Sequence, residues 1–413
     1  MTRFRAAVAL VAAVLFVTPA AARADVVLQW NAIAVGTPAG NPFNQARVMA
    51  ATQLAVFEAL NAITGGYEPY LGTVVAPAGA SADAAVIAAA HKMLKHYAPG
   101  SAVMLDAARA SSLAAIPDGD AKAAGVTVGE AAAAAMIAAR TNDVPPVPEF
   151  YAPSTGAGEW QSTPSCAGGG GVLLHWQNLV PFGIANAADF VAGPPPALTS
   201  NEYAANFEEV KRVGSKTSTE RPQDRSDVAR FYAGSSPAYV MNLAARQVAE
   251  AQGRSAIHSA RALALINMAI SDAAVASFAT KYRYTLWRPE TAIHGAETDG
   301  NSKTEADLTW EPYIAAPCFP AYTSNHGSLS GGGAEVLRRV YGAGEHSITM
   351  TNVNFPGLVY VYSTFHDITA DIADARVYGG IHFRFDQDSG ARLGREVGTA
   401  VYKGNLRATG GQE

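Results

Sequence analysis

The stretch Pro317-Cys-Phe-Pro-Ala-Tyr-Thr-Ser-Asn-His-Gly-Ser-Leu-Ser-Gly-Gly-Gly333 places a hydroxyl, an amide and an imidazole where a helix begins. Apolar residues at helical spacing follow Ser324-Asn325-His326. The first turn of a helix offers free backbone N–H groups and the positive end of the helix dipole, so it attracts an oxyanion. The same residues also fit an ordinary N-cap serine beside an incidental histidine, since serine caps are common.

The overall composition is typical of packed helices. The chain has 413 residues, of which 49% are hydrophobic and 16% charged, and this balance argues against disorder. Its formal net charge is −5 and it contains no basic run, so nucleic acid and anionic membrane are poor candidates for partners. Its length allows one large domain or two to three ordinary ones.

The first 24 residues have the features of a secretory signal. Two arginines precede a short apolar run at 6–17, and Ala22-Arg23-Ala24 fits a small-x-small cleavage site. We therefore expect a mature start near Asp25 and an exported protein, either periplasmic or extracellular. The apolar run is too short to span a bilayer, and we expect no membrane span elsewhere.

Helical spacing of apolar residues recurs along most of the chain. It predicts helices at 25–35, 47–63, 81–97, 102–116, 120–140, 200–213, 224–232, 238–252, 255–282 and 389–402. Prolines, glycines and aromatic residues interrupt the pattern at 142–196, which we interpret as a long covering loop. No strand alternation or hairpin signal of any strength is present. The sequence therefore predicts an all-α fold of the bundle type.

The chain contains two cysteines, Cys166 in the covering loop and Cys318 in the opening stretch. Export permits a disulfide between them. Two separate buried thiols are an equal alternative.

Three segments, far apart in the sequence, carry most of the charged and hydrogen-bonding chemistry. They are Lys281-Tyr-Arg-Tyr-Thr-Leu-Trp-Arg288-Pro289, the opening stretch, and Arg376-Val-Tyr-Gly-Gly-Ile-His382-Phe-Arg-Phe-Asp386. Together they supply one lysine, two arginines, a serine hydroxyl, helix N-terminal amides and two histidines, which suit an oxyanion. The spacing of seven predicts Lys281 and Arg288 on one helix that Pro289 ends. Gly379-Gly380 would let the backbone come close just before the second histidine.

The order Lys-x6-Arg-Pro, Ser-x-His, Arg-x5-His-x3-Asp resembles the vanadium-dependent haloperoxidases and the type 2 phosphatidic-acid phosphatases that share their site. The residues that flank the motifs resemble the soluble haloperoxidases most. This resemblance is strongest over residues 224–393. The resemblance implies two four-helix bundles, with the site in the C-terminal one. We accordingly expect an N-terminal bundle with the covering loop at 25–215 and a C-terminal bundle at 216–413.

The resemblance also implies roles for the two histidines. His382 would be the ligand to vanadium, or the phosphoryl-accepting nucleophile in a phosphatase. His326 would be the acid/base, and Asp386 would orient His382 or the helix that follows it.

Vanadate is the implied cofactor, with phosphate as a competing occupant. The vanadate oxygens would accept hydrogen bonds from Lys281, Arg288, Ser324, Asn325 and Arg376. Lys281 would also take part in catalysis by activating hydrogen peroxide.

Two positions depart from the family pattern. Asn325 stands where glycine is usual, and Ala375 stands where serine is usual. Asparagine can still offer its backbone N–H, and its side chain could add a donor. Ala375 removes a hydroxyl but no cation, so we expect oxyanion binding to survive.

The resemblance favours a vanadate-dependent haloperoxidase that oxidises halide with hydrogen peroxide to hypohalous acid. Phe319 stands where the family's chloroperoxidases resemble this chain, so chloride oxidation is a hypothesis; the alternative is that Phe319 simply packs. One alternative function is a secreted acid phosphatase that cleaves a phosphate ester through a phosphohistidine. A second is a non-catalytic oxyanion-binding homologue. The sequence leaves the oligomeric state open.

Overall fold

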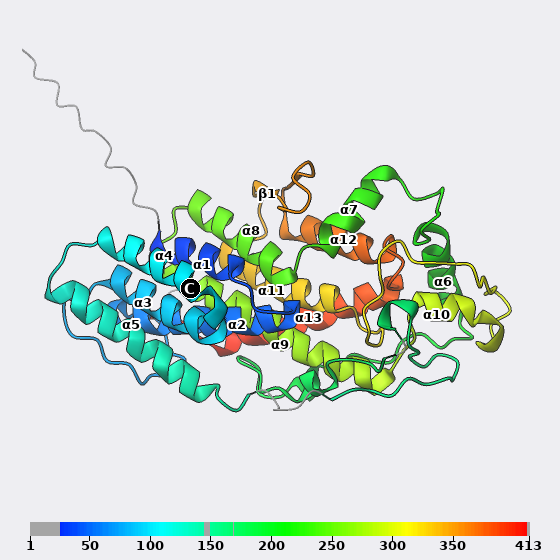
Figure 1. Ribbon diagram of the computed structural model, residues 1–413, viewed down its shortest axis with the longest axis horizontal. Helices are drawn as coiled ribbons and strands as arrows, with labels where there is room; N and C mark the ends of the chain where they lie inside the picture. Colours follow the sequence, from blue (N-terminus) through cyan, green and yellow to red (C-terminus); the bar gives the residue numbers. More distant parts are fainter. Residues whose placement is uncertain (1–24, 144–148, 168, 411–413) are drawn as a thin grey trace, which may run out of the picture.

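The computed structural model describes residues 25–143, 149–167 and 169–410, and within them the chain is mostly helical, as expected (Figure 1). The predicted secretory signal lies outside the described residues. The described ranges contain 13 α-helices, five short 3-10 helices and one two-stranded hairpin.

Five α-helices precede the covering loop: α1 (Val26–Gly36), α2 (Pro42–Thr64), α3 (Ala82–Tyr97), α4 (Ala102–Ala114) and α5 (Asp120–Ala139). Eight follow it: α6 (Asn201–Val213), α7 (Gln223–Ala233), α8 (Pro237–Ala251), α9 (Ala256–Tyr284), α10 (Pro289–His294), α11 (Asn325–Tyr341), α12 (Phe365–Val377) and α13 (Arg384–Gly404). The 3-10 helices are η1 (Pro99–Ser101), η2 (Pro164–Cys166), η3 (Leu174–Asn178), η4 (Ala187–Phe190) and η5 (Ala296–Thr298).

Helix capping moves two of the expected helix starts. Helix α2 begins at Pro42 because the Asn41 side chain accepts hydrogen bonds from the first-turn N–H groups. Helix α13 begins at Arg384 because the Asp386 carboxylate reaches back to the backbone N–H of Phe383.

The prediction that Lys281 and Arg288 share one helix is wrong. Helix α9 ends at Tyr284, and Thr285 after it has a left-handed φ of 48°. Arg288 lies in extended backbone, and Pro289 is the first residue of α10. Proline suits that first position because its missing N–H would have no partner there. Pro289 therefore starts a new helix instead of ending the old one.

The sequence also gave no indication of a small antiparallel hairpin. Strand β1 (Ile348–Met350) pairs with β2 (Tyr360–Tyr362), with Thr349 opposite Val361. Each strand has only three residues, too few for an alternating pattern to stand out.

Helix α9 is the central element of the fold. It packs against α2 on one side and against α11 and α13 on the other, while α3, α4 and α5 lie at one end of the molecule and α6 and α10 at the other (Figure 1). One buried apolar cluster runs through all of these central helices. The expected division near residue 215 stays a prediction.

Helices α11 and α13 approach each other closely because glycines line their contact. A Cβ on Gly394 would lie 2.1 Å from the backbone oxygen of Ser328, so no larger residue fits there. The small residues of the opening stretch thus bring the N-terminal ends of α11 and α13 side by side.

Two described helices, α5 and α9, are long and apolar enough to cross a membrane by length and composition. The apolar window of α9 is 94% buried inside the protein, as for a core helix, whereas that of α5 is 33% buried. Length and composition alone are weak evidence of a span.

Candidate functional site

Four helix ends converge on one buried region: the C-terminal ends of α9 and α12 and the N-terminal ends of α11 and α13. They bring together the residues that the three sequence segments singled out, namely Lys281, Arg288, Phe319, Ser324, Asn325, His326, Arg376, His382 and Asp386. All of these except His326 are buried, and His326 is half-buried.

Lys281 lies in the last turn of α9 and is fully buried. Its ammonium donates to the backbone oxygens of Pro320 and Ala321, at 2.8 and 2.9 Å. Burial, followed by the charge of Arg288, lowers the pKa of Lys281 well below its usual value, and Asp386 opposes this shift. The lysine is therefore held by main-chain carbonyls of the opening stretch.

Arg288 is held by the same segment. Its Nε donates to the backbone oxygen of Phe319 at 2.8 Å, and its Nη1 donates to that of Ile381 at 2.9 Å. Burial lowers the pKa of Arg288 to about 9. The ring of Phe319 lies beneath both cations, with Lys281 Nζ 5.1 Å and the Arg288 guanidinium carbon 5.0 Å from its centre.

Arg376, in the last turn of α12, is the third buried cation. Its Nη1 donates to the backbone oxygen of Tyr232 at 3.3 Å, and burial lowers its pKa to about 10.

His382 lies between α12 and α13. Its Nδ1 donates to Asp386 at 2.9 Å, and its Nε2 accepts from Arg288 Nη1 at 3.1 Å. The neutral ring with its proton on Nδ1 satisfies both contacts. Burial and then Arg288 and Lys281 lower the pKa of His382 well below its usual value, which keeps Nε2 unprotonated. Burial raises the pKa of Asp386 to about 7.

A glycine places His382 at this point, as the sequence predicted. Gly380 has a left-handed φ of 78°, and a Cβ on it would lie 2.3 Å from the backbone oxygen of Gly214. Only glycine allows both the turn and the close approach.

The opening stretch, residues 317–333, lines another side of the site with Ser324, Asn325 and His326. Ser324 caps α11 by accepting from the backbone N–H of Gly327 at 3.3 Å. Asn325 occupies the first helical position, where backbone N–H groups lack an intrahelical partner. Burial, then Arg376, lowers the pKa of His326 well below its usual value.

One side of His326 faces a cavity of about 330 Å³. The cavity is also lined by Pro42, Gln45, Ala233, Gly234, Ser235, Ser236, Tyr239, Asn352, Val353 and Asn354. None of these other lining residues carries a charge at neutral pH, so the cavity is a neutral approach to a cationic site.

An oxyanion fits this arrangement because donors here have no partner within the protein. Among the residues that the structure describes, Arg288 Nη2, Arg376 Nε and His326 Nε2 are buried without a hydrogen bond. Leaving a buried charged donor unpaired is costly, as is burying three cations near a single carboxylate. Vanadate or phosphate would supply both the acceptors and the negative charge.

The sequence identified the charged side chains of the site but missed what holds them. Lys281, Arg288 and Arg376 are oriented by main-chain oxygens, including that of Tyr232 on α7. Backbone oxygens carry no sequence signature, so no motif could have indicated them.

Comparisons with known proteins point to one family. The family model described as the VCPO second helical-bundle domain matches residues 261–411, which include every proposed site residue. Vanadium chloroperoxidase of Curvularia inaequalis is 27% identical over 184 residues. That match covers 37% of this chain and 30% of the length of the relative.

The solved structures agree over nearly the whole chain. The structure described as the first bacterial vanadium-dependent iodoperoxidase is 24% identical with a TM-score of 0.79, and the match covers 93% of this chain and 96% of that one. An apo-type bacterial vanadium-dependent chloroperoxidase is 18% identical with a TM-score of 0.72, over 90% and 96% of the two chains. The resemblance to the vanadium haloperoxidases is confirmed. The all-α haloperoxidase fold is thereby shown.

Proposed function

We propose that this protein is a vanadate-dependent haloperoxidase that oxidises halide with hydrogen peroxide to hypohalous acid. The observation that carries the proposal is the set of buried side-chain nitrogens without partners on Arg288, Arg376 and His326, the residues whose charges act on His382. Bound there, vanadate would supply a Lewis-acid centre that activates peroxide toward halide without a change in its oxidation state.

Different residues would bind the metal and neutralise the charge of the oxyanion. His382 Nε2 would bind the metal, with Asp386 fixing the tautomer through Nδ1. Lys281, Arg288 and Arg376 would neutralise the oxygens, together with Ser324 and the backbone N–H of Asn325.

His326 would exchange a proton on the cavity side of the site. Its lowered pKa leaves the ring neutral and able to accept a proton at neutral pH.

Chloride belongs in the proposed halide range because of Phe319. The ring packs below Lys281 and Arg288 and contributes no titratable group to the site. The similar proteins are described as a chloroperoxidase and an iodoperoxidase, so the assay should run chloride, bromide and iodide in parallel.

Export is also part of the proposal. The structure joins Cys166 and Cys318 in a disulfide, and disulfides persist in oxidising compartments outside the cytosol.

The deciding assay measures halogenation of a phenol reporter with peroxide and halide, with and without vanadate. We expect activity only with vanadate, and a fall of at least about 100-fold in His382→Ala, because loss of a ligand should cost no less than loss of a group that orients one. His366→Ala, at an exposed histidine, is the matched control and should keep full activity.

Cleavage of a phosphate ester without vanadate, and no halogenation, would favour the phosphatase instead. Oxyanion binding without either reaction would favour a non-catalytic homologue. Full activity in His382→Ala would refute the assigned site.

A further inference from the structure

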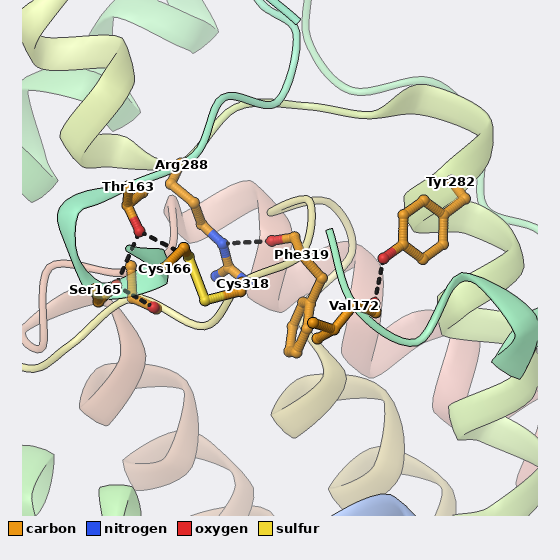
Figure 2. Close-up of a disulfide and its surroundings, with 9 residues drawn as sticks. Thr163, Ser165, Cys166, Val172, Tyr282, Arg288, Cys318 and Phe319 are labelled. Atoms are coloured by element: carbon orange, nitrogen blue, oxygen red, sulfur yellow. Dashed lines mark hydrogen bonds between the residues drawn. A yellow bond between two sulfur atoms is a disulfide. The ribbon is translucent and has the colours of Figure 1, made fainter. Parts of the chain in front are cut away.

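The disulfide lies on the segment that holds two of the site's cations. Cys318 immediately precedes Phe319, Pro320 and Ala321, whose backbone oxygens receive Arg288 and Lys281. Figure 2 shows the disulfide beside the hydrogen bond from Arg288 to Phe319. A shift of Cys318 would therefore move the acceptors that aim both cations.

The segment 316–321 belongs to no helix or strand in the described chain, so contacts with other segments must fix it. Lys281, Arg288 and the hydrogen bond from the Ala321 N–H to the Leu286 oxygen supply some of them, and the covering loop supplies three more. Cys166 is joined to Cys318 with a Cα separation of 5.5 Å, Val172 donates its N–H to the Cys318 oxygen at 2.8 Å, and Ser165 Oγ donates to the Ala316 oxygen at 2.7 Å.

The covering loop is in turn fastened to the helix that carries Lys281. The hydroxyl of Tyr282, the next residue along, donates to the backbone oxygen of Val172 (Figure 2). The covering loop therefore contacts both the segment 316–321 and the end of α9, and Lys281 on α9 donates to that same segment. The disulfide is the covalent bond within this group of contacts.

We propose that Cys166 and Cys318 are positioning residues for the oxyanion site: their disulfide fixes the carbonyls of 319–321 and so directs Lys281 and Arg288 toward the bound oxyanion. The inference rests on the proposed function only in requiring that this site bind an oxyanion. It requires neither peroxide nor halide chemistry.

Reduction provides a reversible way to remove the link. A dithiol such as dithiothreitol delivers two electrons and two protons, so the S–S bond breaks, two thiols form, and the dithiol closes to its own disulfide. The carbonyls of 319–321 would then be held by hydrogen bonds alone.

The test is calorimetric titration with inorganic phosphate and with orthovanadate, at a temperature where circular dichroism shows an intact fold. We expect the oxidised protein to bind both, and the Cys166→Ala/Cys318→Ala variant to bind both about 10-fold more weakly, as when an orienting group is lost. The reduced protein is titrated with phosphate alone, because a dithiol also reduces vanadate, and it should bind phosphate about 10-fold more weakly. Reoxidation should restore the affinity of the wild type, and dithiothreitol should not change that of the double variant.

A matched control separates positioning from general stability. The Asp272 carboxylate accepts backbone N–H groups of residues 182–184, so it anchors the same covering loop away from 316–321. Asp272→Asn removes an acceptor for these N–H groups and should leave phosphate affinity unchanged. If it weakened phosphate binding as much as loss of the disulfide does, the positioning role would be refuted.

If the double variant does not fold, the reduced wild-type protein decides, because it keeps every side chain and loses only the S–S bond. Ser165→Ala keeps the disulfide and loses one hydrogen bond to the same segment, so its phosphate affinity should stay within about threefold of wild type, the scale of one neutral hydrogen bond. Wild-type affinity in a folded double variant or in the reduced protein would overturn the inference. Failure to halogenate in a protein that binds phosphate would count against the proposed function alone.

Discussion

At the scale of single residues, the site is defined by unpaired groups. Arg288 Nη2, Arg376 Nε and His326 Nε2 are buried without partners among the described residues. A fold that buries cations near few anions is stable only if other interactions compensate. A bound oxyanion offers that compensation, so phosphate or vanadate should also stabilise the folded protein.

Two substitutions of Asn325 distinguish whether its backbone N–H or its side-chain amide binds the oxyanion. Asn325→Gly keeps the backbone N–H and removes two buried side-chain atoms without partners, so phosphate affinity should stay within about threefold of wild type. Asn325→Pro deletes the N–H, so affinity should fall roughly 10-fold or more, the scale of a hydrogen bond to a charged group.

The proline variant should retain the helix. Position 325 is the first of α11, where proline is favoured, and Ser324 before it is extended, with φ −67° and ψ 125°. Titration calorimetry measures both affinities. A tenfold loss in the glycine variant would show instead that the side-chain amide binds the anion.

Residue chemistry was the most predictable level of the site. Spacing and charge grouped Lys281, Arg376 and His382 into one expected oxyanion site, and in the structure the charges of Lys281 and Arg376 act on His382. The placement of Arg288 on the helix of Lys281 was wrong, since a periodic pattern does not reveal that Thr285 turns left-handed. The neutral state of His382 depends on burial, which follows only from the complete packing.

At the scale of elements, helix ends rather than helix faces build the site. The N-terminal ends of α11 and α13 meet because glycines let these helices touch, and the covering loop closes the wall beside α9. The sequence predicted most helix cores within a few residues. It missed α12, although Phe365, Ile368 and Ile372 stand at helical spacing. It also missed the short helix α10 and the hairpin, because three-residue strands show no alternation.

The cavity beside His326 gives an element-scale prediction. Ala233, the last residue of α7, is exposed and lines that cavity. Ala233→Trp should partly fill it and slow phosphate association about 10-fold, while equilibrium affinity changes little because the donors are untouched. Stopped-flow binding measures the rate.

Ala233→Ser is the matched control and should bind at the wild-type rate, because serine adds one atom. An unchanged rate in the tryptophan variant would mean that the oxyanion reaches the site by another path.

At the scale of the whole molecule, α9 connects the core, the covering loop and the site. Lys281 lies in its last turn, and Asp272 two turns earlier holds the loop. Both oxygens of this buried carboxylate accept backbone N–H groups, those of Phe182, Gly183 and Ile184, at 2.7 to 3.0 Å. The loop is thus fixed at two places, by the disulfide and by Asp272.

Asp272 should make stability depend on pH. Burial raises its pKa in the folded protein to about 6 from its ordinary 3.8, so the folded state binds the proton more tightly than the unfolded chain. Its contribution is complete below pH 3.8 and is lost as the pH rises through about 6. Between pH 7.5 and pH 5 the wild type should therefore gain about 1 kcal/mol from this residue. Urea denaturation of wild type and Asp272→Asn at both pH values isolates the effect, because other carboxylates contribute equally to both proteins. Parallel pH slopes in the two proteins would show that Asp272 is ionised in the folded state throughout this range.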